Sequence, residues 1–222
     1  MELHQKADPY YVLATTMKPP HRRVTALAAF CVAGFAFDAL ATCGPQDDAQ
    51  ADYFGAAKLE DVRARADGGN AAAQNEMGRR YGVGKDVAKN SEISFSWYEK
   101  AATQHFCAAE ANLAFMYLNG EGTAKDAQAA KEWSLKAAAQ GAPRSQYALG
   151  YMYATGVLGK PDGRSAEYWF RKAAYRGDVG AQRVLIRFYE SGELVPKDLE
   201  EAALWLHRVR DAGGGRVWRQ EE

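Results

Sequence analysis

Residues 145–177 read SQYALGYMYATGVLGKPDGRSAEYWFRKAAYRG, and their pattern is copied along most of the 222-residue chain. Tyrosines return at intervals of 36 residues, at Tyr81, Tyr117, Tyr153 and Tyr189. Tryptophans keep the same interval, at Trp97, Trp133, Trp169 and Trp205. Each tryptophan is followed three residues later by a cation, namely Lys100, Lys136, Lys172 and Arg208. A fixed interval shared by rare aromatic residues predicts a repeat protein, in which each copy is one supersecondary unit.

Each copy is predicted to form two helices joined by a glycine turn. In the second copy, Leu113 and Tyr117 have the spacing of one helical face, and Gly120 ends that helix. Asp126 is placed to cap the next helix, which Gly141 ends. The same reading predicts helices at residues 71–82, 91–104, 107–118, 126–140, 144–154, 162–176, 180–190 and 198–212, after a partial leading helix at 56–67.

One such hairpin cannot bury its own apolar face, so neighbouring copies must stack. The predicted fold is therefore all-α, an α/α solenoid of about four 36-residue helix-turn-helix repeats. The repeated tyrosines and tryptophans are expected to fill the space between helices, where each buries a large apolar area. The alternative is a tryptophan ladder that binds a sugar or a cofactor, but periodic core packing already accounts for these residues.

Three segments carry a resemblance to a known family: SQYALGYMYATG at 145–156, DGRSAEYW at 162–169 and KAAYRG at 172–177. Together they resemble the Sel-one-like repeat, an α/α solenoid relative of the tetratricopeptide repeat, and the match spans about residues 57–213. The resemblance implies an adaptor or regulatory role without catalysis. Some secreted members of the family staple each repeat with paired cysteines, a pattern that this chain lacks.

The first 43 residues have a different character. A basic cluster at 21–23 precedes an apolar run at 24–37 and small residues at 39–43, which is the order of a secretory signal. Asp38 disfavours a permanent membrane span, and Met17 fits the start of translation better than Met1. The predicted organisation is a signal peptide at 1–43, a polar tether at 44–55, a solenoid at 56–214 and a C-terminal tail at 215–222.

The processing site at the end of the signal peptide decides whether the protein is anchored to a membrane or released. Leu40-Ala-Thr-Cys43 resembles a bacterial lipobox, whose cysteine receives the lipid, although Thr42 stands where Gly, Ala or Ser is usual. We favour this reading, which gives an exported periplasmic protein anchored to the outer membrane by a lipid on Cys43. A cut after Ala41 would instead release a soluble periplasmic or secreted chain. A third alternative is an intracellular adaptor made from Met1.

Charge and motifs argue against several function classes. The 28 Lys and Arg balance 28 Asp and Glu, so no bulk attraction to nucleic acid or anionic lipid is expected. His105 and His207 are the only histidines after the leader, and they are too far apart in the repeat to share a metal or nucleophile site. Cys107 is expected to be a small buried residue rather than a reactive thiol. We therefore expect no catalytic residue, metal, cofactor or small-molecule substrate.

The partner-binding surface is predicted on the first helix of each repeat, which lines the concave side of such solenoids. Positions two before and two after the repeated Met or Leu fall four apart, on one side of the helix. We name these positions the first-helix stripe: Asn75, Arg79, Ala111, Phe115, Tyr147, Tyr151, Arg183 and Arg187. They change type from copy to copy, and tyrosine and arginine are frequent in protein-recognition hot spots. The expected partner is a peptide or protein with some acidic groups.

Two alternatives to this surface stay open. Some of its residues, Phe115 above all, can belong to the core between repeats. An envelope protein that binds or hydrolyses carbohydrate would use the same groove, with Glu110, Asn112 and Tyr147 as its polar and aromatic groups.

Overall fold

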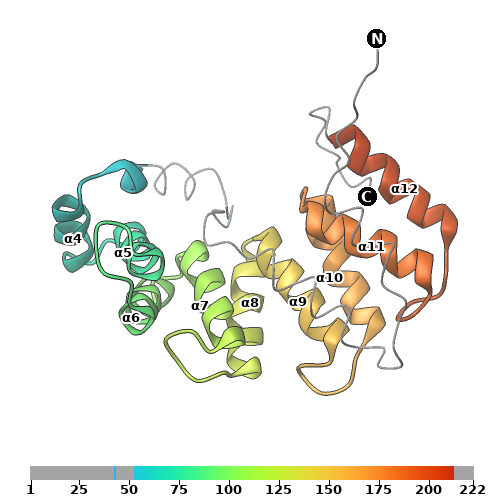
Figure 1. The fold of residues 1–222 in the computed structure, drawn as a ribbon, viewed down its shortest axis with the longest axis horizontal. Helices are drawn as coiled ribbons and strands as arrows, with labels where there is room; N and C mark the ends of the chain where they lie inside the picture. Colours follow the sequence, from blue (N-terminus) through green and yellow to red (C-terminus); the bar gives the residue numbers. More distant parts are fainter. Residues whose placement is uncertain (1–42, 44–52, 213–222) are drawn as a thin grey trace, which may run out of the picture. The chain divides into compact units, whose positions relative to one another are not determined.

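The structure is a computed structural model, and it describes residue 43 and residues 53–212 (Figure 1). The chain divides into two compact units, Met1–Phe35 and Ala36–Glu222, and every described residue belongs to the second. The described part of this unit contains helices and connecting turns and no strand. Most of the predicted leader, tether and C-terminal tail lies outside the described residues.

The helices follow the predicted repeat closely (Figure 1). They are α4 (Leu59–Asp67), α5 (Ala71–Val83), α6 (Ser91–Ala102), α7 (Cys107–Asn119), α8 (Ala127–Ala139), α9 (Pro143–Thr155), α10 (Gly163–Tyr175), α11 (Val179–Ser191) and α12 (Leu199–Ala212). The predictions from residue 71 onward are confirmed to within two residues at each end. The leading helix begins at Leu59 instead of residue 56, because the backbone is still extended at Lys58.

The same local signals define every repeat. The first helix of each pair ends at a glycine in the left-handed conformation, with φ between 69° and 80°: Gly84, Gly120, Gly156 and Gly192. The second helix begins at a side-chain cap, whose oxygen accepts a hydrogen bond from the backbone N–H three residues later: Asn90, Asp126, Asp162 and Asp198. The capping role predicted for Asp126 is confirmed, and the equivalent residues of the other repeats act in the same way.

Stacking of neighbours supplies the core. The main contacts of each helix are with the helices before and after it in the chain, and α7 also contacts α9. The repeated apolar residue of each first helix is completely buried: Met77, Leu113, Leu149 and Leu185. Alanines of the second helices, such as Ala101, Ala137 and Ala173, are buried as well. The helical hairpins thus stack on one another, as predicted for an α/α solenoid.

The repeated tryptophans pack into this core and are covered by the cations that follow them. Trp205 is completely buried. Trp97 and Trp133 are partly buried against the core of the first two repeats. Lys136 Nζ lies 3.6 Å from the ring centroid of Trp133, and the corresponding distance for Lys100 and Trp97 is 4.1 Å. These cation–π contacts explain the shared interval of tryptophan and lysine, and they favour the packing role over the ladder.

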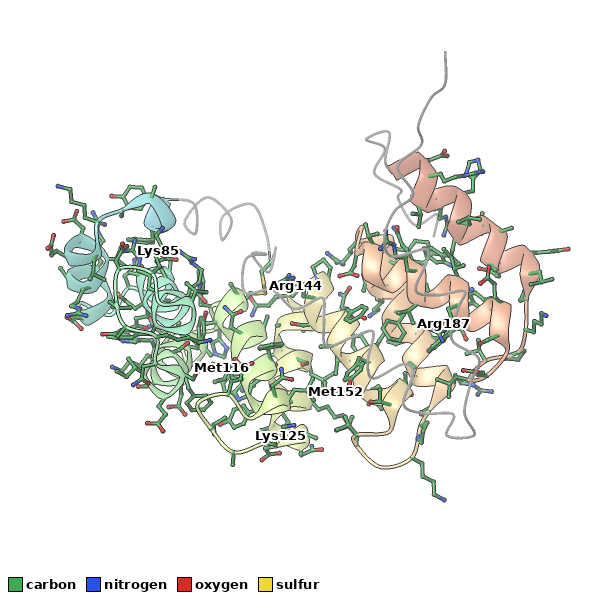
Figure 2. The ribbon with its side chains drawn as sticks, in the orientation of Figure 1. Lys85, Met116, Lys125, Arg144, Met152 and Arg187 are labelled. Atoms are coloured by element: carbon green, nitrogen blue, oxygen red, sulfur yellow. A yellow bond between two sulfur atoms is a disulfide. The ribbon has the colours of Figure 1, made fainter. Side chains whose placement is uncertain are left out.

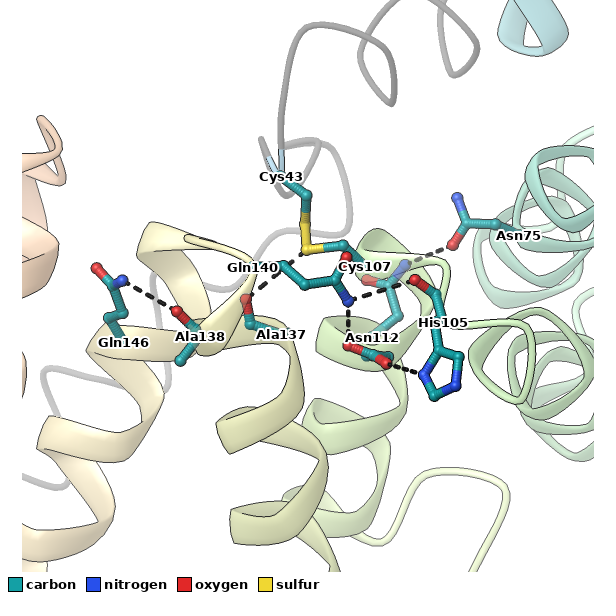
Figure 3. The surroundings of a disulfide bond; sticks show 10 residues. Cys43, Asn75, His105, Cys107, Asn112, Ala137, Ala138, Gln140 and Gln146 are labelled. Atoms are coloured by element: carbon teal, nitrogen blue, oxygen red, sulfur yellow. Dashed lines mark hydrogen bonds and ion pairs between the residues drawn. A yellow bond between two sulfur atoms is a disulfide. The ribbon is translucent and has the colours of Figure 1, made fainter.

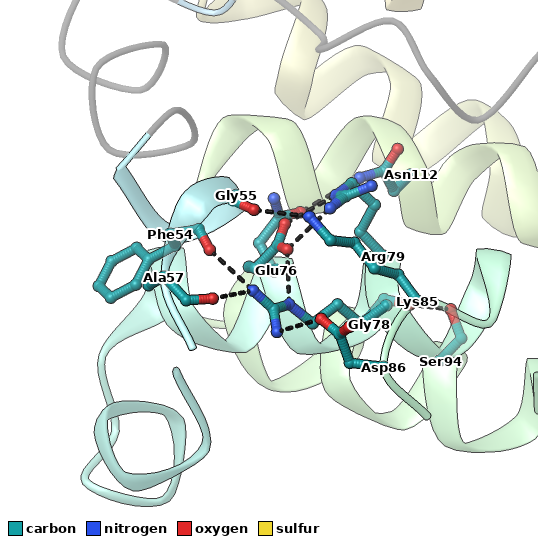
Figure 4. A network of polar contacts seen from close by, with 12 residues as sticks. Phe54, Gly55, Ala57, Glu76, Gly78, Arg79, Lys85, Asp86, Ser94 and Asn112 are labelled. Carbon is teal, nitrogen blue, oxygen red and sulfur yellow. Dashed lines mark hydrogen bonds and ion pairs between the residues drawn. The ribbon is translucent and has the colours of Figure 1, made fainter. Parts of the chain in front are cut away.

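A buried arginine joins the first repeat to the segment before it (Figure 4). Arg80 on α5 is fully buried, and its guanidinium pairs with Glu76 at 2.8 Å and with Asp86 at 2.9 Å. The same group donates to the backbone carbonyls of Phe54 and Ala57. Because this one side chain satisfies acceptors from three segments, it fixes residues 54–57 against α5.

Candidate partner-binding face

The first half of the first-helix stripe is occupied by contacts within the protein. Asn75 is buried, and its Oδ1 accepts a hydrogen bond of 3.1 Å from Asn112 Nδ2 of the next first helix. Arg79 binds the Glu76 carboxylate through two nitrogens, Nε at 2.7 Å and Nη2 at 2.8 Å. Asn75 therefore helps to hold the first and second repeats together, whereas Arg79 is paired within its own helix.

The middle of the stripe is shared between the surface and the core. Tyr147 on α9 is partly buried, and its ring meets the ring of Phe170 edge-on, with 5.3 Å between centroids. Tyr151, one turn further, packs against the buried cluster that contains Leu149 and Met152. Phe115 is partly buried too. Tyr151 thus packs on a cluster shared by the second and third repeats, whereas Tyr147 packs on Phe170 within its own repeat.

The last part of the stripe faces solvent. Arg183 and Arg187 are both exposed on α11, and Val179, one turn earlier, is 45% exposed. Neither arginine forms an ion pair with any residue that the structure describes. Figure 2 shows Arg187 on α11 and Arg144 on the preceding first helix, α9. Burial lowers the pKa of Arg144, and the charge of Asp178 partly offsets this effect.

The three residues of the carbohydrate alternative have different neighbours. Glu110 is buried, and its Oε2 accepts a hydrogen bond of 2.7 Å from Gln140 Nε2. Asn112 donates to Asn75, whereas Tyr147 packs on Phe170. In the described residues, nothing brings these three side chains to one site.

Burial raises the pKa of Glu110 above its ordinary value, while the hydrogen bond from Gln140 and the nearby His105 and Lys136 lower it. His105 Nδ1 lies 3.6 Å from Glu110 Oε1. Oε1 itself is buried and has no hydrogen-bond donor among the described residues. Burial therefore favours the protonated form of this carboxyl group, and its polar neighbours favour the ionised form.

Cys43, the expected lipid acceptor, forms a disulfide in the structure. Its Sγ is bonded to Sγ of Cys107, with 5.8 Å between the two Cα atoms (Figure 3). A lipid thioether would need the same sulfur atom, so the two modifications exclude each other. Cys107 is buried as expected, at 1% exposure, but its disulfide was missed. The sequence feature that could have revealed it is the even count of two cysteines, Cys43 and Cys107, in the chain that remains after either predicted cut.

The described residues contain no group of three or more His, Cys, Asp or Glu side chains that could hold a metal ion. Within the same residues, no helix has the length and apolar character needed to cross a bilayer.

Comparison with known proteins agrees with this architecture. The model of the Sel1 repeat matches residues 71–106, 107–141, 143–178 and 181–213. No curated protein matches the chain. The crystal structure of a protective antigen present in uropathogenic Escherichia coli strains, which displays an SLR fold, is 36% identical, with a TM-score of 0.66. A Sel1 repeat protein from Oxalobacter formigenes is 34% identical, with a TM-score of 0.61.

The matched regions cover 73% and 68% of this chain, but only 34% of the first structure and 62% of the second. The present chain thus spans part of the length of both. Four matched repeats and two similar solved structures nevertheless confirm the resemblance predicted from the sequence. The chain belongs to the Sel1 repeat family.

Proposed function

We propose that this protein is a non-catalytic interaction module of the bacterial cell envelope, which holds a peptide or a partner protein on the first-helix stripe. Sel1 repeat proteins in general mediate contacts between proteins, which supports the class of function. Fold alone does not identify a site, so the choice of surface depends on the side chains.

The proposal rests on a difference between the arginines at the two ends of the first-helix stripe. At its beginning, the guanidinium of Arg79 is already paired with Glu76. At its end, Arg183 and Arg187 lie one helical turn apart, exposed, and without a carboxylate partner among the described residues. Exposed guanidinium groups beside apolar and aromatic surface suit a partner that supplies acidic groups and a small apolar contact.

The envelope location is supported by two features. The basic cluster, apolar run and small residues of the leader have the order of an export signal. The disulfide between Cys43 and Cys107 fits an oxidising compartment, because thiols are kept reduced in the cytosol. Both features disfavour the intracellular adaptor.

The test compares capture of a partner from envelope extract by the wild-type protein and by Arg183→Glu/Arg187→Glu. The matched control, Lys160→Glu/Arg164→Glu, makes the same change of charge at exposed residues outside the stripe. We expect a partner, identified by mass spectrometry, that the wild type and the control bind equally. The stripe variant should bind it at least about tenfold more weakly, a loss of roughly 1.4 kcal/mol.

Thermal melting by circular dichroism must be the same for all three proteins, since the four substituted side chains are exposed. Tyr151 is unsuitable for this comparison because its substitution would also disturb a core cluster. Equal capture by both double variants would overturn the assignment of the stripe.

A further inference from the structure

The sulfur atoms of Cys43 and Cys107 meet in a buried part of the solenoid. Cys107 is the first residue of α7, and its Sγ lies 3.8 Å from the carbonyl oxygen of Ala137 on α8. Cys43 packs on the same cluster, which also contains Ala142 at the start of the third repeat. Figure 3 shows the bridge between the chain at residue 43 and the beginning of α7. Residue 43 is therefore part of the packed unit.

This placement conflicts with a lipid anchor in two ways. The lipid is attached through Sγ, and here that atom is already bonded to Cys107. An acyl anchor must also reach the bilayer, whereas Cys43 is partly buried against the second and third repeats.

The sequence offers a second processing site one residue earlier. Ala39-Leu-Ala41 has small residues at the two positions that a signal peptidase recognises, and a cut after Ala41 leaves Thr42-Cys43 at the new amino terminus. The third cysteine, Cys31, lies in the leader and would be removed with it. The processed chain would then contain two cysteines, and both are accounted for by the bond.

We propose that Cys43 is a disulfide partner and not a lipid acceptor. The leader is removed after Ala41, and the new amino terminus is fastened to the second repeat through Cys107. In forming the bond, the two thiols lose two protons and two electrons, and a protein disulfide of the export compartment takes up both electrons and both protons and becomes a dithiol. This proposal is independent of the partner-binding stripe and can fail or succeed separately from it.

The direct test is to produce the full chain in an exporting bacterium and to block free thiols with iodoacetamide before lysis. Intact mass and non-reducing peptide mapping should show a chain that begins at Thr42, carries no alkyl group and has its Cys43 peptide joined to its Cys107 peptide. A diacylglycerol on Cys43, alkylated thiols at both cysteines, or a chain that retains the leader would overturn the proposal.

Two substitutions separate the two cuts. Thr42→Asp places a charge directly before the lipobox cysteine, where it blocks lipoprotein processing, but it follows the cut after Ala41. Ala41→Asp places the same charge directly before that cut. We expect the Thr42→Asp chain to be processed and the Ala41→Asp precursor to accumulate. The opposite pattern would show that the lipobox is used.

Cys107→Ser tests whether Cys43 receives a lipid when the disulfide cannot form. We expect this variant still to begin at Thr42, to be released from the periplasm by osmotic shock and to carry one alkyl group on Cys43. Because processing of the leader does not depend on folding of the second repeat, a lipid on Cys43 in this variant would contradict the proposal.

Discussion

Gly150 on α9 lies under the ring of Phe170 on α10, so closely that a Cβ on this glycine would be 2.8 Å from ring carbon Cδ1. Gly78 has the same relationship to Tyr98 in the first repeat, at 2.7 Å. The second repeat has Ala114 and Ser134 at the two corresponding positions. In the first three repeats, a large residue on the second helix thus occurs with glycine on the first helix, and a small one with alanine. The fourth repeat has Ile186 and an exposed Leu206 at these positions and does not follow this pattern.

This pairing predicts coupling between the two positions. Gly150→Ala should destabilise the protein by about 1–3 kcal/mol, because Phe170 is completely buried and its ring cannot move aside. Phe170→Ser should cost about 3–5 kcal/mol through the cavity that it leaves. The double variant reproduces the pair of residues found in the second repeat. Its loss of stability should be smaller than the sum of the losses of the two single variants. Urea unfolding of the four proteins measures the coupling, and simple additivity would refute it.

Arg80 is predicted to hold the beginning of the described solenoid in place. Arg80→Ala removes a buried cation and leaves the Glu76 carboxylate without one of its two partners, which should cost about 3–5 kcal/mol. Residues 54–57 also lose the donor to two backbone carbonyls, so their amide hydrogen exchange should accelerate more than that of α9 to α11.

Arg79→Ala is the matched control, because Arg79 binds the same carboxylate from a more exposed position. This variant should lose no more than about 1 kcal/mol. An equal loss for the two variants, or unchanged exchange at residues 54–57 in Arg80→Ala, would contradict the role assigned to Arg80.

The helices could be predicted because their signals are local and repeated. Gly120 ends α7 and Asp126 caps α8, and the two residues are close together in the sequence. The end of one helix and the start of the next could therefore be predicted from this short segment alone. The burial of Met77 and Leu113 followed from the same interval, since each repeat provides the neighbour of the next. One error was the leading helix, which has no preceding repeat to set its start.

The candidate site was harder to predict, because contacts between repeats decide which of its residues are buried and which are exposed. Asn75 and Arg183 occupy equivalent positions of the repeat, yet Asn75 is buried against Asn112 whereas Arg183 is exposed. The disulfide was missed for a similar reason. Its cysteines are separated by 64 residues, and a motif around Cys43 offered a local explanation that made a distant partner unnecessary.

Glu110 is predicted to make stability depend on pH. The corresponding residues of the other repeats are Gln74, Gln146 and Gln182, and each donates its side-chain N–H to a carbonyl oxygen of the preceding helix. An ionised Glu110 cannot donate, and burial raises its pKa in the folded protein. The stabilising contribution of its neutral form is complete below the pKa of the unfolded chain and is lost as the pH rises through the folded pKa.

Glu110→Gln should therefore be more stable than the wild type at neutral pH, and the difference should shrink as the pH falls. One added hydrogen bond of about 1 kcal/mol corresponds to a rise of about 2–4 °C in Tm for a domain of this size. Melting curves between pH 4 and pH 8 measure the effect. Gln146→Glu is the reverse exchange in the third repeat and should introduce the same dependence. A Glu110→Gln protein that is less stable at every pH would refute this account.

The disulfide is predicted to stabilise the first repeat by restricting the unfolded chain. Cys43 and Cys107 close a loop with a sequence separation of 64 residues, which contains α4, α5 and α6. In the chain-entropy model, a loop of this length is worth about 4 kcal/mol. A non-thiol phosphine reductant should therefore lower the Tm of the wild-type protein, whereas Cys43→Ser should start from the lower Tm and show no further change.

Because the bond joins residue 43 to α7, hydrogen exchange after reduction should accelerate mainly in α4 to α6 and leave α11 and α12 protected. A wild-type protein that melts at the same temperature with and without reductant would show that the bond does not constrain the unfolded chain.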